Sequence, residues 1–204
     1  MVLNNSMKNY MQTGFTLLEL MVVIGMMGTL IAIGVPSFTS MITTNELADI
    51  TTDLTLSLKR ARAEAIASGR DVVVCSSATT DSTSDGNAKC SLSAGNWDKG
   101  WLIMIDRNQD GSFLESQNEL IWVKHIDVNT SVTITPGPFA PLGLTNDFSQ
   151  VVLFSHTGEL KDGTAGGFQV CSGVSGSGYA RRDITVSVSG QTNFVKNTAT
   201  GNDC

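Results

Sequence analysis

The sequence of 204 residues is poor in charge, histidine and aromatic side chains. Charged residues make up 16% and aromatic residues 6% of the chain, which is untypical of a coiled coil or a charge-rich disordered protein. With 13 basic against 19 acidic side chains the net charge is −6, which argues against a general nucleic-acid binder. Two histidines and no Cys/His pair at ligand spacing argue against a zinc site. We therefore expect no cofactor.

Catalytic motifs are also lacking. The sequence holds no G-x-S-x-G element, no Walker loop and no paired-carboxylate site. Ser155 and His156 are adjacent on an expected strand, where neighbouring side chains point to opposite faces, so they do not form a nucleophile–base pair. The sequence therefore predicts a protein that is not an enzyme.

The cysteines are even in number and widely spaced, without a C-x-x-C pair. This pattern is typical of disulfides in an oxidising compartment. Of the three connectivities open to four cysteines, we predict Cys75 with Cys90 and Cys171 with Cys204. The first bridge would close the polar loop at 76–96, and the second would fasten a polar tail that begins at Thr192.

The N-terminal region contains a long uncharged run. No charged residue occurs between Leu20 and Asn45, and the segment LMVVIGMMGTLIAIGV at 20–35 approaches the ~20 apolar residues of a membrane-spanning helix. The polar stretch 1–14 carries one cation, Lys8, and its small residue Gly14 precedes the apolar run, unlike the cleavage site of a secretory signal. Cleavage after Gly14 would leave the apolar helix on the mature protein.

The segment GFTLLEL at 14–20, followed by an apolar run with Pro36, resembles the type III signal sequence of type IV pilins and type II secretion pseudopilins. The resemblance implies cleavage by a prepilin peptidase between Gly14 and Phe15, methylation of Phe15, Glu19 as the fifth mature residue, and a helix kink at Pro36. A carboxylate in a membrane segment needs a partner, and for Glu19 this would be the new α-amino group of Phe15. The alternative is that Glu19 only complements the helix dipole.

Beyond the apolar run the sequence predicts one helix to Ser68 and then strands. An apolar stripe at helical spacing is formed by Leu47, Ile50, Leu54, Leu58, Ala61 and Ala65. A helix from Thr16 to Ser68 would be ~80 Å long. Strands are expected at 71–76, 101–106, 120–126, 131–135, 151–155, 168–172 and 183–189. We expect an α+β fold in which an antiparallel sheet packs on the helix, with a leader at 1–14, an apolar helix at 15–42 and a domain at 43–204.

Five runs in the second part of the chain, at 58–75, 97–111, 151–160, 168–171 and 180–190, resemble the GspH/FimT family of minor pilins and pseudopilins. The resemblance implies a non-catalytic subunit in the tip or priming complex of a type IV pilus, with other major and minor pilins, prepilin peptidase and an inner-membrane assembly platform as partners. It also implies a single-pass inner-membrane protein with a periplasmic C-terminal domain, later incorporated into a filament. The alternative is the corresponding pseudopilin of a type II secretion system.

DNA binding is a further alternative. Relatives that take up DNA carry Gly-Arg-x-Arg where this chain has Gly-Gln-Thr-Asn at 190–193, so both arginines are missing. The remaining candidate DNA contacts are Arg181, Arg182 and Lys196, and we expect weak binding.

Two other patterns have simpler interpretations. Asp106, Asn108, Asp110 and Gly111 imitate the start of an EF-hand loop, but Gln117 stands where the bidentate Glu belongs. A turn between strands is the simpler interpretation, so no metal is expected and calcium is kept as an alternative. The tryptophans at 97, 101 and 122 are expected to pack in the core or on a sheet face and not to form a recognition platform.

Overall fold

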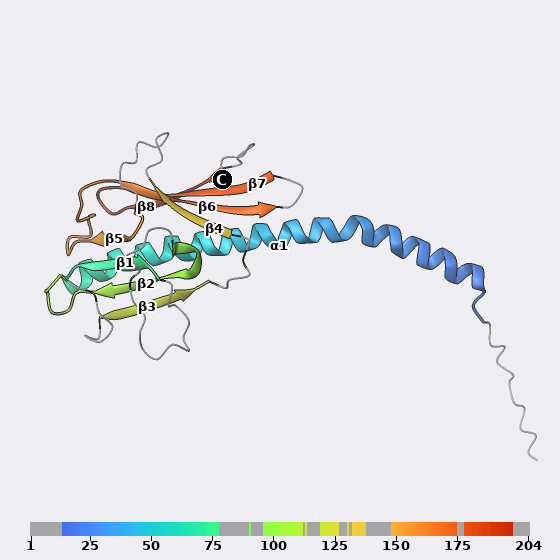
Figure 1. The fold of residues 1–204 in the computed structure, drawn as a ribbon, viewed down its shortest axis with the longest axis horizontal. Helices are drawn as coiled ribbons and strands as arrows, with labels where there is room; N and C mark the ends of the chain where they lie inside the picture. Colours follow the sequence, from blue (N-terminus) through green and yellow to red (C-terminus); the bar gives the residue numbers. More distant parts are fainter. Residues whose placement is uncertain are drawn as a thin grey trace, which may run out of the picture. The chain divides into compact units, whose positions relative to one another are not determined.

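The computed structural model describes residues 14–77, 90, 96–111, 113, 119–126, 130, 132–137, 148–174 and 178–197. The chain divides into two compact units, Met1–Thr39 and Ser40–Cys204. The boundary expected between 42 and 43 stays a prediction. Helix α1 is Leu17–Ser68 and the short 3-10 helix η1 is Asn96–Lys99. The strands (Figure 1) are β1 Val72–Ser76, β2 Gly100–Ile105, β3 Leu120–His125, β4 Val132–Gly137, β5 Val151–Phe154, β6 Gly166–Val174, β7 Gly178–Val186 and β8 Thr192–Asn197.

Helix α1 begins one residue after the expected start at Thr16 and ends at Ser68, as expected. At its C-terminus Gly69 adopts a left-handed conformation with φ of 65°. The main-chain N–H groups of Gly69 and Arg70 both donate to the carbonyl of Ala65, at 3.0 and 3.3 Å, which closes the last turn as glycine caps do. The helix continues through Pro36. The kink expected at Pro36 stays a prediction.

In the second unit the predicted apolar stripe of α1 is buried, and so are hydroxyl groups beside it. All six stripe residues are at most 7% exposed. Thr51, Thr55 and Ser57 are buried as well, and each hydroxyl donates to the carbonyl four residues earlier, at 2.6, 2.8 and 2.7 Å. Because the helix satisfies these polar groups itself, it buries a wider surface than the apolar stripe alone.

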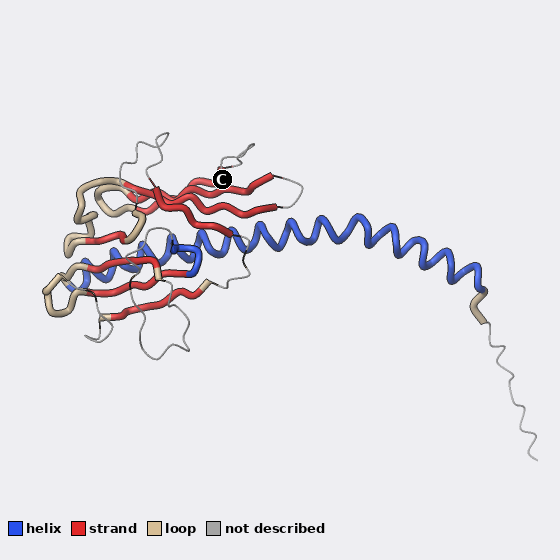
Figure 2. Tube along the Cα trace, in the orientation of Figure 1, coloured by secondary structure: helices blue, strands red, loops and turns tan. Residues whose placement is uncertain are grey.

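That wider burial follows from the number of sheets. The strands form two four-stranded antiparallel sheets, ordered β3-β2-β1-β5 and β4-β6-β7-β8, where the sequence predicted a sheet without resolving two. Figure 2 shows the second-unit part of α1 (blue) between the strands (red) of the two sheets. Val74 and Ile103 of the first sheet and Val170 and Ile184 of the second belong to the same core cluster as the helix stripe.

The seven expected strands are all present, with ends shifted by a few residues, and one strand was not expected. The polar tail that was predicted from Thr192 instead contributes β8, which pairs antiparallel with β7 at the sheet edge. The sequence of β8 does not alternate between apolar and polar residues as a half-buried strand would. Among its described side chains only the polar Thr192 is buried, whereas the apolar Phe194 is exposed. Main-chain pairing to β7 therefore places this strand.

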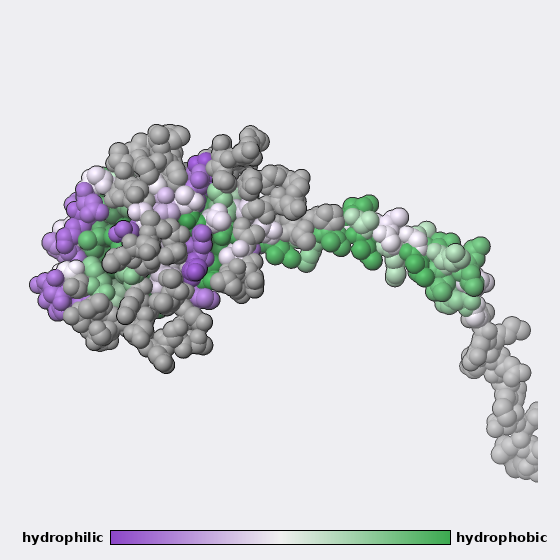
Figure 3. All heavy atoms as spheres, in the orientation of Figure 1, coloured by the Kyte–Doolittle hydropathy of each residue, from purple (hydrophilic) through white to green (hydrophobic). Residues whose placement is uncertain are grey.

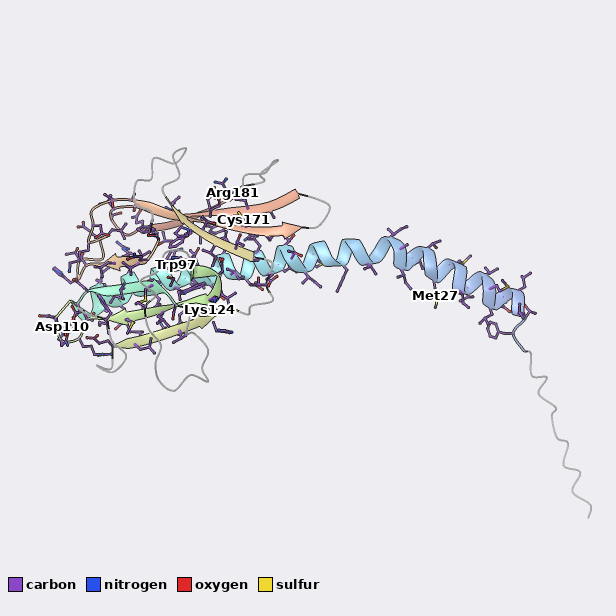
Figure 4. All side chains as sticks on the ribbon, viewed as in Figure 1. Met27, Trp97, Asp110, Lys124, Cys171 and Arg181 are labelled. Carbon is purple, nitrogen blue, oxygen red and sulfur yellow. A yellow bond between two sulfur atoms is a disulfide. The ribbon has the colours of Figure 1, made fainter. Side chains whose placement is uncertain are left out.

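The tryptophans at 97 and 101 are core residues, as predicted. Both are fully buried, and the Trp97 ring lies 4.7 Å from that of Phe168 in an edge-to-face contact (Figure 4). Its Nε1 donates to the main-chain carbonyl of Phe148 at 3.2 Å, so the polar edge of the ring is satisfied. Trp122 lies on the first sheet, partly buried, with the guanidinium of Arg60 6.0 Å from its ring centroid.

The disulfide predicted between Cys75 and Cys90 is confirmed. It lies on the face of the first sheet that does not belong to the main core, in a second cluster with Val73, Leu102 and Met104. Both faces of β1 are therefore covered, which explains its continuous apolar sequence. Cys171 is in a disulfide as well. Its expected partner Cys204 lies outside the described residues, so that pairing stays a prediction.

Candidate functional site

The predicted processing site lies at the start of α1. Thr16 caps the helix: its Oγ1 accepts a hydrogen bond from the Glu19 main-chain N–H at 3.2 Å, and its carbonyl accepts from Leu20 at 3.2 Å. Glu19 is thus the third residue of the helix, with its carboxylate near the positive end of the helix dipole. The T-x-x-E spacing is a capping-box signal that the sequence analysis did not use. Gly14 and Phe15 directly precede this cap.

The first unit exposes apolar side chains all along its helix. Leu17–Val35 is long and apolar enough to cross a membrane, with a mean hydropathy of 2.2, and none of its most apolar stretch is buried. Figure 3 shows the N-terminal part of α1 covered by hydrophobic residues (green). Exposed apolar area of this extent is unfavourable in water, so the segment requires a bilayer or other protein surfaces around it.

The three candidate DNA contacts do not form one basic patch. Arg181 is 15% exposed and makes a two-pronged ion pair with the buried Asp183, at 2.7 and 3.1 Å (Figure 4). Arg182 is the next residue of β7 and so points to the opposite face of the sheet. It pairs in register with Lys196, whose side chain lies outside the described part of the structure. The charge of Arg181 is therefore largely neutralised where it stands.

The turn at Gly190–Asn193 lies against α1, which sequence reasoning missed. It borders a cleft of about 360 Å³ whose helix side is formed by Lys59, Arg62, Ala63 and Ile66. Arg62 Nε donates to the carbonyl of Gly158 at 2.9 Å. Gly190 has a φ of 76°, and a Cβ there would lie 2.0 Å from the same Gly158 oxygen.

The loop after β2 brings Asp106, Asn108 and Asp110 into one turn. Asn108 Nδ2 donates to Asp110 Oδ2 at 2.8 Å, and Asn108 Oδ1 accepts from the Asp110 N–H at 3.0 Å. Among the described residues, no group of three or more His, Cys, Asp or Glu side chains is placed to hold a metal ion. This loop combines two carboxylates with one amide.

Comparison with known proteins supplies the family. Residues 51–190 match the family described as "Type II transport protein GspH". The chain belongs to the GspH family. Residues 9–35 of this GspH-family chain match the prokaryotic N-terminal methylation motif, which spans the predicted cleavage site and the apolar helix. No curated protein sequence matches the chain.

A solved structure has a similar fold. A crystal structure of the type IV minor pilin FimU from Pseudomonas aeruginosa (strain PAO1) is similar at 18% identity and a TM-score of 0.51, covering 79% of this chain and 96% of FimU. A second crystal form of FimU gives 16% identity and a TM-score of 0.49, covering 77% and 98%. The long helix followed by antiparallel sheets is thus the type IV pilin fold.

Family and fold together define a class of protein. GspH-family members with this fold are structural pilin subunits, which are not enzymes. The methylation motif and the apolar helix make this chain a membrane-anchored pilin. Membership also implies processing by a prepilin peptidase and assembly with other pilins.

Proposed function

We propose that this protein is a minor pilin that acts as a structural and assembly subunit of a type IV pilus, in its tip or priming complex. The observation that carries the proposal is the methylation motif joined to an apolar helix without a buried residue in its most apolar stretch. Such a helix is stable in the inner membrane before assembly and among the helices of other pilins afterwards. The second unit, with its own closed core, would face the periplasm.

Processing would prepare the helix for this transfer. Cleavage between Gly14 and Phe15 removes the leader with Lys8, which holds the N-terminus on the cytoplasmic side. It creates an α-amino group directly before the Thr16 cap. The carboxylate of Glu19, in the first helical turn, would pair with that amino group or with that of a neighbouring subunit. In an apolar bundle an unpaired charge is costly, so this pairing would set the position of the subunit.

The alternative within the same class is a pseudopilin of a type II secretion system. The family description, which names type II transport, favours this alternative. The similarity to the minor pilin FimU concerns the fold alone, and both kinds of subunit would share that fold. Both systems would use the same leader, helix and domain. Crosslinking the protein in cells and identifying its neighbours by mass spectrometry distinguishes them, because the two filaments contain different subunits.

Mass spectrometry of the mature N-terminus tests the processing step. We expect the protein to begin at a methylated Phe15. Replacing Gly14 by a bulky residue should leave full-length precursor in the inner membrane, since it removes the small residue that precedes the predicted cleavage site. A mature protein that retains residues 1–14, or one cleaved after the apolar run, would falsify the proposal.

Glu19→Ala tests the assembly role. We expect the variant to be processed and its second unit to stay folded, because all core residues in the described part of the chain come from the second unit. Its recovery in sheared filaments should fall at least ~10-fold, the consequence of an unpaired amino group in an apolar bundle. Glu159→Ala removes an exposed acid from the second unit and serves as the matched control. Incorporation of Glu19→Ala at the wild-type level would contradict the role of this carboxylate.

A further inference from the structure

The loop Asp106–Gly111 is held in place from several sides. Asp106 follows β2 directly, and its main-chain N–H donates to the carbonyl of Asp71 at 3.0 Å. The next residue, Arg107, donates its N–H to Glu119 Oε1 at 3.0 Å and accepts a hydrogen bond from the Arg70 guanidinium through its carbonyl. Figure 4 places Asp110 at the end of the domain where α1 terminates. The loop is thus anchored to the end of α1 and to the start of β3.

Asp106 is a buried carboxylate with only one of its oxygens satisfied. The residue is 6% exposed, and its Oδ2 accepts the main-chain N–H of Gly111 at 3.0 Å. Its Oδ1 is buried and has no hydrogen-bond donor in the described part of the chain. An unsatisfied oxygen on a buried carboxylate is costly, and it is the kind of group that a bound cation satisfies.

Two cationic side chains share a cleft with Asp106, and both have other partners. The Lys161 ammonium pairs with Asp71, and this hydrogen bond, reinforced by the Asp71 charge, raises the pKa of Lys161. The charge of Asp106 acts on Lys161 at longer range without a hydrogen bond between them. The Arg70 guanidinium donates to the Arg107 carbonyl. These two side chains and His156 line the same cleft of about 420 Å³ as Asp106 and Asp110.

The oxygen atoms of the loop alternate along a tightly curved backbone. Asp106, Asn108 and Asp110 carry them at every second position. Between and after them, Gln109 and Gly111 have left-handed φ values of 63° and 77°, which curl the chain. Asp106 and Asp110 both line the cleft beside this turn. The bonds between Asn108 and Asp110 show that these side chains already lie together.

We propose that this loop binds one calcium ion through Asp106 Oδ1, the Asn108 side-chain carbonyl and the Asp110 carboxylate, with water completing the shell. Calcium takes 6–8 oxygen ligands at about 2.3–2.6 Å in flexible geometry, whereas magnesium demands a strict octahedron. Two carboxylates supply the charge that a divalent cation requires. Because Gln117 replaces the bidentate Glu and Lys161 lies nearby, the affinity falls in the range of about 10⁻⁴–10⁻³ M that is typical of extracellular modules.

Calcium titration of the full-length protein in detergent tests the site. Isothermal titration calorimetry should show one saturable site, and Tm should rise with calcium, relative to EDTA, as mass action requires. Magnesium at the same concentration should give a much smaller rise. Asp106→Asn should weaken calcium binding at least ~10-fold and should be no less stable than wild type in EDTA, because it removes a buried unsatisfied charge.

Two further variants separate binding from folding. Asp110→Asn changes an exposed residue and should also weaken binding at least ~10-fold, since it removes one of the two ligand charges. Asp162→Asn removes the same charge from an exposed turn nearby and should bind calcium like wild type. No calcium effect in the wild type, an equal effect of magnesium, or wild-type calcium binding by both loop variants would overturn the proposal.

Discussion

At the scale of the residue, Arg62 shows how a polar side chain organises this domain. It extends from α1 to the carbonyl of Gly158, in the turn after β5, and contacts Gly190, in the turn between β7 and β8. Both glycines have positive φ, 81° and 76°, and both stand where a Cβ would collide with the helix side chains or with the other turn. The two turns and the helix therefore meet without room for another carbon atom.

Gly190→Ala should destabilise the second unit more than Gly163→Ala. At Gly190 an added Cβ would lie 2.0 Å from the Gly158 oxygen and 2.8 Å from Arg62 Nε, so the turn must move and the hydrogen bond between them must break. At Gly163 the φ is also positive, 66°, but nothing lies within 4 Å of the added Cβ. We expect Gly163→Ala to cost about 1 kcal/mol of unfolding free energy and Gly190→Ala about 2 kcal/mol more.

Urea unfolding of the two variants in detergent measures this difference. Because both substitutions place alanine in the left-handed region, their difference isolates the close approach of the two turns. Equal losses would mean that backbone strain alone explains the need for glycine at position 190.

Asp98→Asn should stabilise the protein at neutral pH. Burial raises the pKa of the Asp98 carboxyl above its ordinary value of 3.8, although the hydrogen bond from the Ile134 N–H acts in the opposite direction. The folded state therefore holds the proton more tightly than the unfolded state, and stability is lost as pH rises through the folded pKa. Asparagine keeps an acceptor for Ile134 and carries no charge at any pH.

The measurement is unfolding free energy as a function of pH. We expect the advantage of Asp98→Asn at pH 7 to shrink toward zero as pH falls to about the ordinary carboxyl pKa, where the wild-type side chain is also neutral. Asp162→Asn removes one negative charge at an exposed position, so it serves as the control for the change in net charge. A wild type that is the more stable protein at pH 7 would contradict this account.

At the scale of the element, the sequence predicts the helix and strands that have a periodic apolar pattern. It does not predict which strands pair with one another. The stripe from Leu47 to Ala65 and the seven apolar strands follow from periodicity, because burial on one helix face or inside a sheet imposes it. The division into two sheets and strand β8 depend on which strands pair, and pairing uses main-chain groups that every residue except proline carries in full.

The candidate sites divide in the same way. The motif from Gly14 to Glu19 is contiguous, so the sequence alone reveals it. The ion pair that neutralises Arg181 joins positions two apart on one strand, a spacing that acquires meaning only once β7 is known to be a strand. Contacts of Arg62 with Gly158 and Gly190 span 96 residues and more, and no local pattern announces them.

The Cys75–Cys90 bridge fastens Cys90 onto the first sheet, and its loss should be costly. The two residues are 15 apart in sequence, and a loop of this length restricts the unfolded chain by about 3 kcal/mol in the entropic account. We expect Cys75→Ala/Cys90→Ala to lower the unfolding free energy by about 2–4 kcal/mol. Alanine is chosen over serine because position 75 is fully buried, where a serine hydroxyl would be shielded from water.

Unfolding of the oxidised wild type and of the double variant gives the comparison. Cys171→Ala/Cys204→Ala, the second predicted bridge, provides a parallel pair, and non-reducing peptide mapping identifies the linked peptides. Peptides that join Cys75 to Cys171 would contradict the assigned connectivity. If Cys75→Ala/Cys90→Ala were as stable as wild type, packing alone would be enough to hold residue 90 against the first sheet.

At the scale of the whole molecule, apolar surface and charge are separated along the sequence. The first unit exposes a continuous apolar helix, whereas the second unit buries most of its described apolar residues in two clusters. The net charge of −6 becomes one unit more negative when the leader with Lys8 is removed. A mature subunit of this kind approaches polyanions against its overall field, so any attraction to DNA must come from a local group of cations.

The cations that line the cleft at the Gly190–Asn193 turn are Lys59 and Arg62 of α1, and they are too few for tight DNA binding. We expect the full chain in detergent to bind double-stranded DNA weakly in gel-shift titrations, with affinity falling steeply as salt is added, since two or three phosphate contacts release few counterions. Lys59→Ala should reduce the residual binding. Arg181→Ala/Asp183→Asn removes the ion pair without leaving a buried charge, and it should leave DNA binding unchanged, because Asp183 already neutralises Arg181. Tight binding at physiological salt, or its loss in the ion-pair variant, would show that the outer face of the second sheet contacts DNA after all.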